Sequence, residues 1–123
     1  MRTLVAGSRD FGNYNLLERT LLNLENKPTV ILSGTARGAD QIGEWFALKH
    51  KILLEKYPAN WDTYGKSAGY RRNELMVWKA EQVVVFWDGE SKGTKHTIEL
   101  TKGRGLYLLI VKYKETSIEP KLS

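Results

Sequence analysis

The sequence has no cysteine, three prolines and no long apolar run. The lack of cysteine excludes disulfide bridges, thiolate catalysis and cysteine-based metal sites. The longest uninterrupted apolar runs, 83–87 and 106–111, are far shorter than the roughly 20 residues that a membrane-spanning helix needs. The first apolar stretch is also too short for a signal peptide. These absences predict a cytoplasmic protein without membrane contacts.

Length and composition indicate one globular domain. The 123 residues are 41% hydrophobic and 27% charged, which is ordinary for a folded domain. Lys and Arg number 19 against 14 Asp and Glu, so the net charge of +5 favours anionic partners such as nucleotides or nucleic acid. The basic residues do not cluster, and a solvated basic face would explain the charge as well. His50 and His96 have no partner at metal-ligand spacing, so we expect neither a metal nor a cofactor.

Short apolar runs alternate with helix-spaced stretches along the chain, which is typical of an α/β fold. The predicted strands are 3–6, 29–32, 52–57, 82–87 and 106–111. Four stretches between them carry apolar or small residues on one helical face: Leu17, Leu21 and Leu24; Ala39, Ile42, Phe46 and Ala47; Ala68, Arg72, Leu75 and Met76; Thr94, Ile98 and Thr101. We therefore predict a three-layer α/β/α sandwich on a mainly parallel five-stranded sheet, formed by residues 1–112 and followed by a polar tail, 113–123.

Ligands of open parallel sheets bind beyond the carboxyl ends of the strands. Three of the loops expected there combine glycines, hydroxyls and a basic residue just before a helix: 7–11, 33–40 and 88–94. This combination suits a phosphate, because glycine lets the backbone approach and the helix N-terminus offers free N–H groups. None of these loops has the Walker A or Gly-x-Gly-x-x-Gly pattern, which disfavours P-loop hydrolysis and ordinary dinucleotide binding. Glycine and serine are also common in strand-to-helix turns of any function.

The connection that starts at Pro58 is the longest and contains two aromatic residues. It is a candidate lid in which Trp61 or Tyr64 stacks on a base, although Trp61 packed beneath the loop is an equally good interpretation. Arg72 follows on the next helix, where its guanidinium either reaches an anion or pairs with a carboxylate such as Asp40.

Four motifs in order resemble the SLOG superfamily, the Rossmann-like group that includes the Lonely Guy phosphoribohydrolases and DprA, and most closely its small, often phage-encoded YspA-like branch. They are Gly7-Ser8-Arg9, Ser33-Gly34 with Gly38-Ala39-Asp40, Arg72-Asn73, and Trp87-Asp88-Gly89 with Ser91, Gly93 and Thr94. The resemblance implies a Rossmann-like fold and a site for a nucleotide or nucleotide derivative. It places phosphate near Gly93 and Thr94, and implies a homo-oligomer, in the host cytoplasm if the gene is phage-borne.

The residues expected to bind the ligand all come from these motifs and the long connection. They are Gly7, Ser8, Arg9, Ser33, Gly34, Gly38, Asp40, Trp61, Arg72, Asn73, Asp88, Gly89, Ser91, Gly93 and Thr94.

The sequence departs from the enzymatic branch at one position. Lonely Guy enzymes resemble this chain at Gly93-Thr94 but carry a catalytic glutamate where Thr97 stands here. Glu99 lies about 200° around the helix from Thr97, so it is expected to point away. A threonine hydroxyl neither stabilises an oxocarbenium ion nor activates water well. The resemblance therefore favours a binding module, either a sensor or a sequestering protein.

Two other functions stay open. One is N-glycosidic hydrolysis of nucleoside monophosphates, with Arg72, Asp40 and Asp88 as candidate catalytic residues and Asp10 and Asp62 as further carboxylates at this edge. Asp40 is alternatively a cap of the second helix, and Asp88 either contacts a ribose or holds the Gly89 turn. The other is binding of single-stranded DNA, suggested by the DprA-like stretch after the second strand and by the positive charge.

Overall fold

The computed structural model describes residues 1–113, so most of the expected polar tail, 114–123, lies outside the described residues. The elements run in the order β1 (Arg2–Gly7), α1 (Tyr14–Leu22), β2 (Val30–Ser33), α2 (Ala39–Lys49), β3 (Leu53–Lys56), α3 (Trp61–Tyr64), a 3-10 turn (Gly65–Ser67), α4 (Ala68–Lys79), β4 (Gln82–Trp87), α5 (Lys92–Arg104) and β5 (Tyr107–Lys112). Among these residues, no helix is both long and apolar enough to span a membrane.

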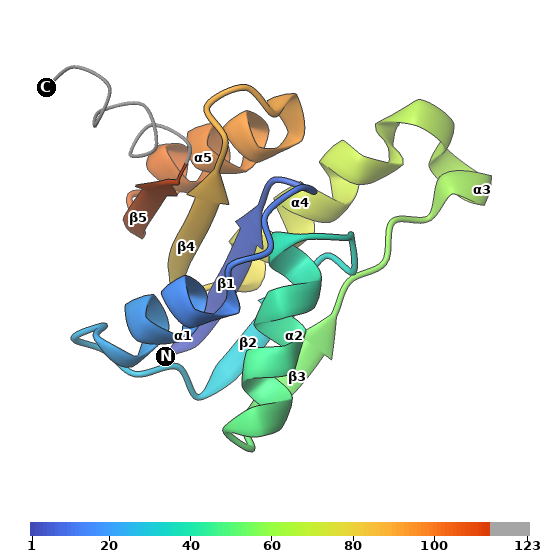
Figure 1. Ribbon diagram of the computed structural model, residues 1–123. Coiled ribbons are helices and arrows are strands. Elements are labelled where there is room, and N and C mark those ends of the chain that lie inside the picture. The colour runs from blue at the N-terminus through green and yellow to red at the C-terminus, as the bar shows by residue number, and fades with distance from the viewer. Residues whose placement is uncertain (114–123) are drawn as a thin grey trace, which may run out of the picture.

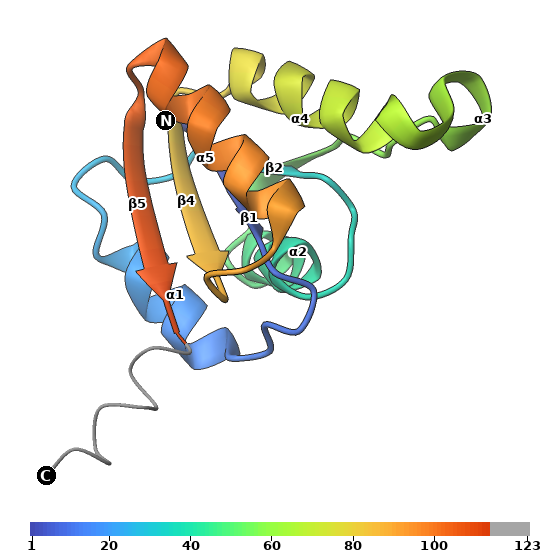
Figure 2. The same cartoon turned by 90° about the horizontal axis from the view of Figure 1, so that it is seen from above.

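The five strands form one sheet in the order β3-β2-β1-β4-β5. Every neighbouring pair is parallel, including β1 with β4, where Leu4 pairs with Val83. Figure 1 shows the sheet with its helices, and Figure 2 shows the same arrangement from above. This confirms the predicted Rossmann-like α/β architecture. The strand order reverses between β1 and β4, which is where such sheets bind ligands.

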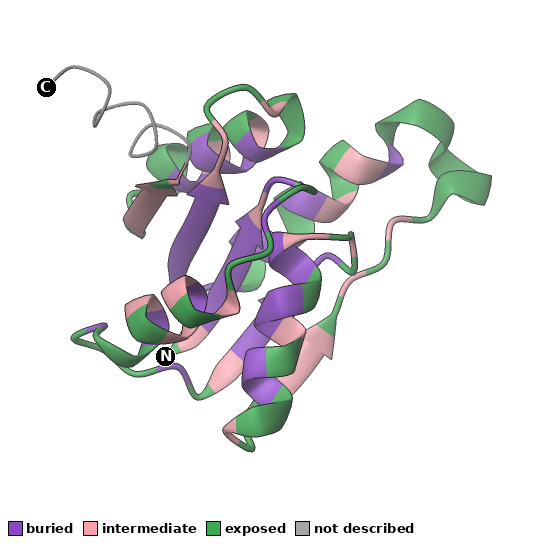
Figure 3. Ribbon diagram, in the orientation of Figure 1, coloured by how far each residue is buried: buried purple, intermediate pink, exposed green. Residues whose placement is uncertain are grey.

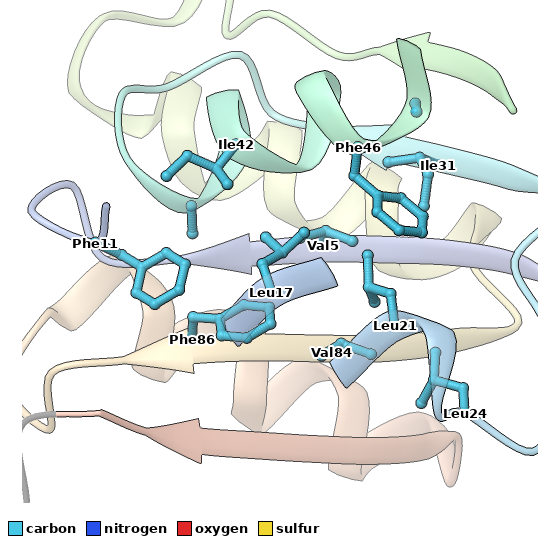
Figure 4. Packing of buried hydrophobic residues seen from close by; sticks show 12 residues of the cluster. Val5, Phe11, Leu17, Leu21, Leu24, Ile31, Ile42, Phe46, Val84 and Phe86 are labelled. Atoms are coloured by element: carbon cyan, nitrogen blue, oxygen red, sulfur yellow. The ribbon is translucent and has the colours of Figure 1, made fainter. Parts of the chain in front are cut away.

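Helices cover both faces of the sheet, so alternate residues of the central strands point into two separate cores. On one face Leu17 and Leu21 of α1 and Phe46 of α2 pack against Val5 and Phe86 (Figure 4). On the other face, the cluster joins α4 and α5 to the strands. Its buried members are Leu4, Ala6, Leu32, Met76, Val77, Ala80, Val83, Val85 and Ile98. The centre of the sheet is therefore buried on both sides, as Figure 3 shows for β1 and β4.

Two local expectations were wrong. The long connection after β3 is not an open loop, because Asn60 caps the short helix α3 by accepting a hydrogen bond from the Thr63 N–H, and the chain runs on through the 3-10 turn into α4. Leu75 does not share the buried face of α4, since its side chain is 46% exposed while Asn73 is buried instead. Helical spacing alone could not show that α4 contacts the sheet with only part of its length.

Candidate functional site

A pocket of about 100 Å³ lies at the carboxyl edge of the sheet, at the reversal between β1 and β4. It is built from the end of β1, the loops after β1, β2 and β4, the middle of α4 and the beginning of α5. The residues around it are Ala6, Gly7, Arg9, Ala36, Asp40, Arg72, Asn73, Met76, Ser91, Gly93, Thr94 and Thr97. Three expected loops and the Arg72-Asn73 motif therefore meet in one place.

The first turn of α5 forms one wall of this pocket. Ser91 caps the helix, with its hydroxyl oxygen accepting hydrogen bonds from the Thr94 backbone N–H at 3.4 Å and the Thr94 hydroxyl at 3.1 Å. A side chain at Gly93 would meet nothing within 4 Å, so the approach to this turn is open. The positive end of a 13-residue helix thus borders the pocket together with two hydroxyls.

Arg72 forms the opposite wall. Its Nη1 donates to the carbonyl oxygen of Gly34 at 2.5 Å, and its Nε donates to Oδ1 of Asn73 at 3.0 Å. Burial lowers the pKa of Arg72, partly offset by the charge of Asp40. No ion pair within 4.0 Å joins Arg72 to Asp40 in the described part of the chain, so the guanidinium is held mainly by a backbone carbonyl. Arg9, from the loop after β1, is the second cation at the pocket.

Asp40 is a buried carboxyl group between these two arginines. Burial raises the pKa of Asp40 to about 6, although the Ala36 N–H and the charges of Arg72 and Arg9 act in the opposite direction. Oδ2 of Asp40 accepts a hydrogen bond from the Ala36 N–H at 3.1 Å. Asp40 is therefore not the cap of α2: that position is Gly38, and Asp40 instead holds the loop that precedes the helix.

Several expected ligand residues hold the loops rather than face the pocket. The hydroxyl oxygen of Ser8 accepts from the Asp88 N–H at 3.0 Å, and Ser33 donates to Glu44 at 2.7 Å. Gly38 has a φ of +76°, and a side chain there would come within 2.3 Å of the Ser8 carbonyl oxygen. This close approach is what requires glycine between the loops after β1 and β2.

Asp88 holds the turn after β4, which was one of its two predicted roles. Its Oδ1 accepts hydrogen bonds from the backbone N–H groups of Glu90 and Ser91, both at 2.8 Å. Gly89 lies inside that turn with a φ of +88°. The carboxylate therefore orients the α5 N-terminus and does not line the pocket itself.

Trp61 and the remaining carboxylates also lie outside the pocket. Trp61 is 55% exposed and does not pack beneath the connection. Asp62 is in the exposed first turn of α3, and Asp10 accepts a hydrogen bond from the Tyr113 hydroxyl. Within residues 1–113, no group of three or more His, Asp or Glu side chains is arranged to hold a metal ion.

Four pocket residues were not among the expected ligand residues: Ala6, Ala36, Met76 and Thr97. Thr97 is buried, with its hydroxyl donating to the Gly93 carbonyl oxygen at 3.3 Å, whereas Glu99 is exposed. The side chain at the position of the Lonely Guy glutamate therefore does face the pocket. Ala6, Ala36 and Met76 carry no polar signal in the sequence, and only the packing of the strands and loops brings them there.

Comparisons with known proteins agree with this architecture. A family model described as YAcAr, the YspA, cpYpsA-related SLOG family, matches residues 1–64. The "Gene 61 protein" of Mycobacterium phage D29 is 31% identical over 114 residues, covering 85% of this chain and 91% of the phage protein. The X-ray structure of DNA processing protein A (DprA) from Streptococcus pneumoniae has a similar fold, with a TM-score of 0.57 at 19% identity. That likeness covers 95% of this chain and 61% of the DprA chain.

Proposed function

Because the chain belongs to the YspA, cpYpsA-related SLOG family, as its loop motifs predicted, we propose that it binds a nucleotide or nucleotide-derived ligand as a sensor or sequestering module. The observation that supports this most directly is the pocket at the β1/β4 reversal, which Arg9 and Arg72 line together with the N-terminus of α5. Two guanidinium groups and a helix N-terminus together favour an anion with several oxygens, such as a phosphate.

The phosphate lies at the first turn of α5 in this proposal. The free N–H groups of that turn and the Ser91 hydroxyl donate to its oxygens, and Arg9 and Arg72 balance its charge. The Nη1–carbonyl bond to Gly34 fixes the guanidinium of Arg72 before the ligand arrives, so little side-chain entropy is lost on binding.

The test is calorimetric titration of the protein with inorganic phosphate, ribose 5-phosphate and a panel of nucleoside monophosphates. Native mass spectra of the mixtures report whether the ligand stays intact. Arg9→Ala is expected to weaken binding of every phosphate compound by about tenfold or more, since a charge-assisted contact is worth on the order of 1.5–3 kcal/mol. Arg19→Ala, an exposed arginine on α1, is the matched control. Absence of binding across the panel would refute the proposal.

Hydrolysis of an N-glycosidic bond is the second candidate, and Asp40 is the observation that favours it. A carboxyl group whose pKa is about 6 and which lies in the pocket beside Arg72 suits general acid or base catalysis near neutral pH. Release of free base from a nucleoside monophosphate, abolished in Asp40→Asn, would establish this function in place of simple binding. Intact nucleotide after prolonged incubation at high protein concentration excludes it.

A further inference from the structure

The pocket is too small for the whole ligand that the proposed function requires. Its volume of about 100 Å³ compares with roughly 300–1,000 Å³ for pockets that enclose drug-sized ligands. A phosphate and part of a sugar fill such a space, so the base of a nucleotide has to lie outside it. The rest of the binding surface must therefore adjoin one of the pocket walls.

A second hollow, of about 270 Å³, lies between the connection after β3 and the first half of α4. Its apolar lining comes from Pro58, Tyr64, Ala68 and Leu75. Arg72 lines both this groove and the phosphate pocket, so the two hollows are neighbours across one side chain. In Figure 2, α3 and the start of α4 extend outward from the sheet, and the groove belongs to this extension.

We infer that this groove, which we call the base groove, holds the planar, keto-bearing base of the nucleotide whose phosphate occupies the pocket beside α5. The inference rests on the proposed function. It identifies the chemical class of the ligand and assigns a role to α3 and α4.

The stacking surface of the base groove is already assembled. The guanidinium of Arg71 lies over the Tyr64 ring, 4.5 Å from its centroid, and its Nε donates to the Ser67 hydroxyl at 3.1 Å. Tyr64 and Leu75 are each 46% exposed, although both are large and apolar. A planar ring in the groove would cover these surfaces, and stacking of a base on an aromatic side chain stabilises binding by roughly 1–3 kcal/mol.

Most polar groups around the base groove are hydrogen-bond donors, and the Tyr64 hydroxyl can both donate and accept. Arginine side chains offer donors only, and both Arg71 and Arg72 line the groove. Asn60 uses Oδ1 to accept from the Thr63 N–H, which leaves its Nδ2 as the group that can meet a ligand. Because two guanidinium groups and an amide N–H₂ make donors the majority here, the groove favours a base edge that presents carbonyl and ring-nitrogen acceptors. The O6 and N7 atoms of guanine, which arginine commonly contacts, are such an edge.

The experiment compares guanosine monophosphate, adenosine monophosphate and ribose 5-phosphate by calorimetric titration of the full chain. We expect the guanine nucleotide to bind more tightly than the adenine nucleotide, and both to bind more tightly than ribose 5-phosphate. Tyr64→Ala is expected to lower the affinity for guanosine monophosphate by about tenfold and to change the affinity for ribose 5-phosphate by less than about twofold. Trp78→Ala removes an exposed aromatic at the far end of α4 that does not line the groove, and serves as the matched control.

The outcomes separate this inference from the proposed function. If ribose 5-phosphate binds as tightly as guanosine monophosphate, or if Tyr64→Ala weakens both equally, the base groove is refuted while the phosphate pocket stands. If adenosine monophosphate binds as well as guanosine monophosphate, the assignment to a keto-bearing base is wrong. If none of the three phosphate compounds binds, the proposed function itself fails. Circular dichroism of each variant checks that it folds, which the exposure of Tyr64 favours.

Discussion

At the scale of single residues, Gly34 decides how close Asp40 and Arg72 can come to the loop after β2. A methyl group at this position would stand 2.8 Å from Oδ2 of Asp40 and 3.0 Å from Nη1 of Arg72. Both contacts are to the ends of side chains, which can move, so the fold tolerates the added methyl group. Asp40 and Arg72 would have to shift, however, and the shape of the pocket would change with them.

Gly34→Ala is therefore expected to weaken phosphate binding by about tenfold and to reduce the free energy of unfolding by about 1 kcal/mol or less. Calorimetric titration with ribose 5-phosphate and urea denaturation measure the two effects. Gly12→Ala is the control, because a side chain at Gly12 meets nothing within 4 Å. Unchanged affinity in Gly34→Ala would show that Arg72 does not need its present position.

The raised pKa of Asp40 predicts that the free energy of unfolding depends on pH. Burial raises its pKa in the folded chain to about 6 from an ordinary value of 3.8, so the folded state binds more protons between these values. Stability from this group is fully present below pH 3.8 and is lost as the pH rises through 6, by on the order of 3 kcal/mol.

Asp40→Asn removes this titration while keeping an oxygen that can accept from the Ala36 N–H. The difference between wild type and variant in free energy of unfolding is expected to change by about 2.5 kcal/mol between pH 4 and pH 7, in favour of the variant at the higher pH. Urea denaturation across this range measures it. Glu18, whose pKa is lowered to about 2 by bonds to Lys49 and His50, is present in both proteins and cancels in the difference. Parallel curves would contradict the prediction.

At the scale of elements, α5 brings a helix N-terminus to the pocket at the β1/β4 reversal. The helix begins at the pocket because Ser91 caps it and because Asp88 holds the preceding turn. Its other end lies at Arg104, followed by Gly105 in the left-handed conformation. The position of the α5 N-terminus is thus set by two side chains outside the helix itself.

Ser91→Ala removes this cap and is expected to lower the free energy of unfolding by about 1 kcal/mol. It is also expected to weaken phosphate binding several-fold, because the first turn of α5 frays. Ser67→Ala is the control, since Ser67 precedes α4 without a side-chain capping bond. Chemical denaturation and titration with ribose 5-phosphate give the two measurements, and equal behaviour of both variants would argue against a role of the cap.

At the scale of the whole molecule, the net charge of +5 comes from basic residues spread along the chain, while two arginines line the pocket beside α5. Binding of one phosphate compound should therefore depend only weakly on salt, whereas binding of single-stranded DNA through many phosphates should fall steeply as salt rises.

The homo-oligomer expected from the family resemblance stays a prediction. Exposed Trp45, Leu48 and Leu53 offer apolar surface for it.

We expect guanosine monophosphate to lose less than about tenfold in affinity between 50 and 200 mM salt, against the 10³–10⁵-fold typical of proteins with 6–10 phosphate contacts. Fluorescence anisotropy with a labelled single-stranded oligonucleotide, run in parallel, is expected to show weaker binding than the nucleotide at 200 mM salt. Tight oligonucleotide binding that is displaced by neither nucleotide nor phosphate would instead support a DNA-binding function.

The sequence by itself determined the order of the five strands and of every helix except α3, because apolar periodicity and glycine or proline punctuation report local structure. It also determined that Arg9, Asp40, Arg72 and Ser91 gather at one sheet edge, since parallel strands bring their carboxyl ends together. Only the tertiary structure decided which of these side chains face the pocket. Ser8 and Ser33 are as polar as Ser91, yet their hydroxyls bond to neighbouring loops and helices. The base groove depends on how α4 leaves the sheet, which is a matter of packing between distant segments and leaves no local pattern in the chain.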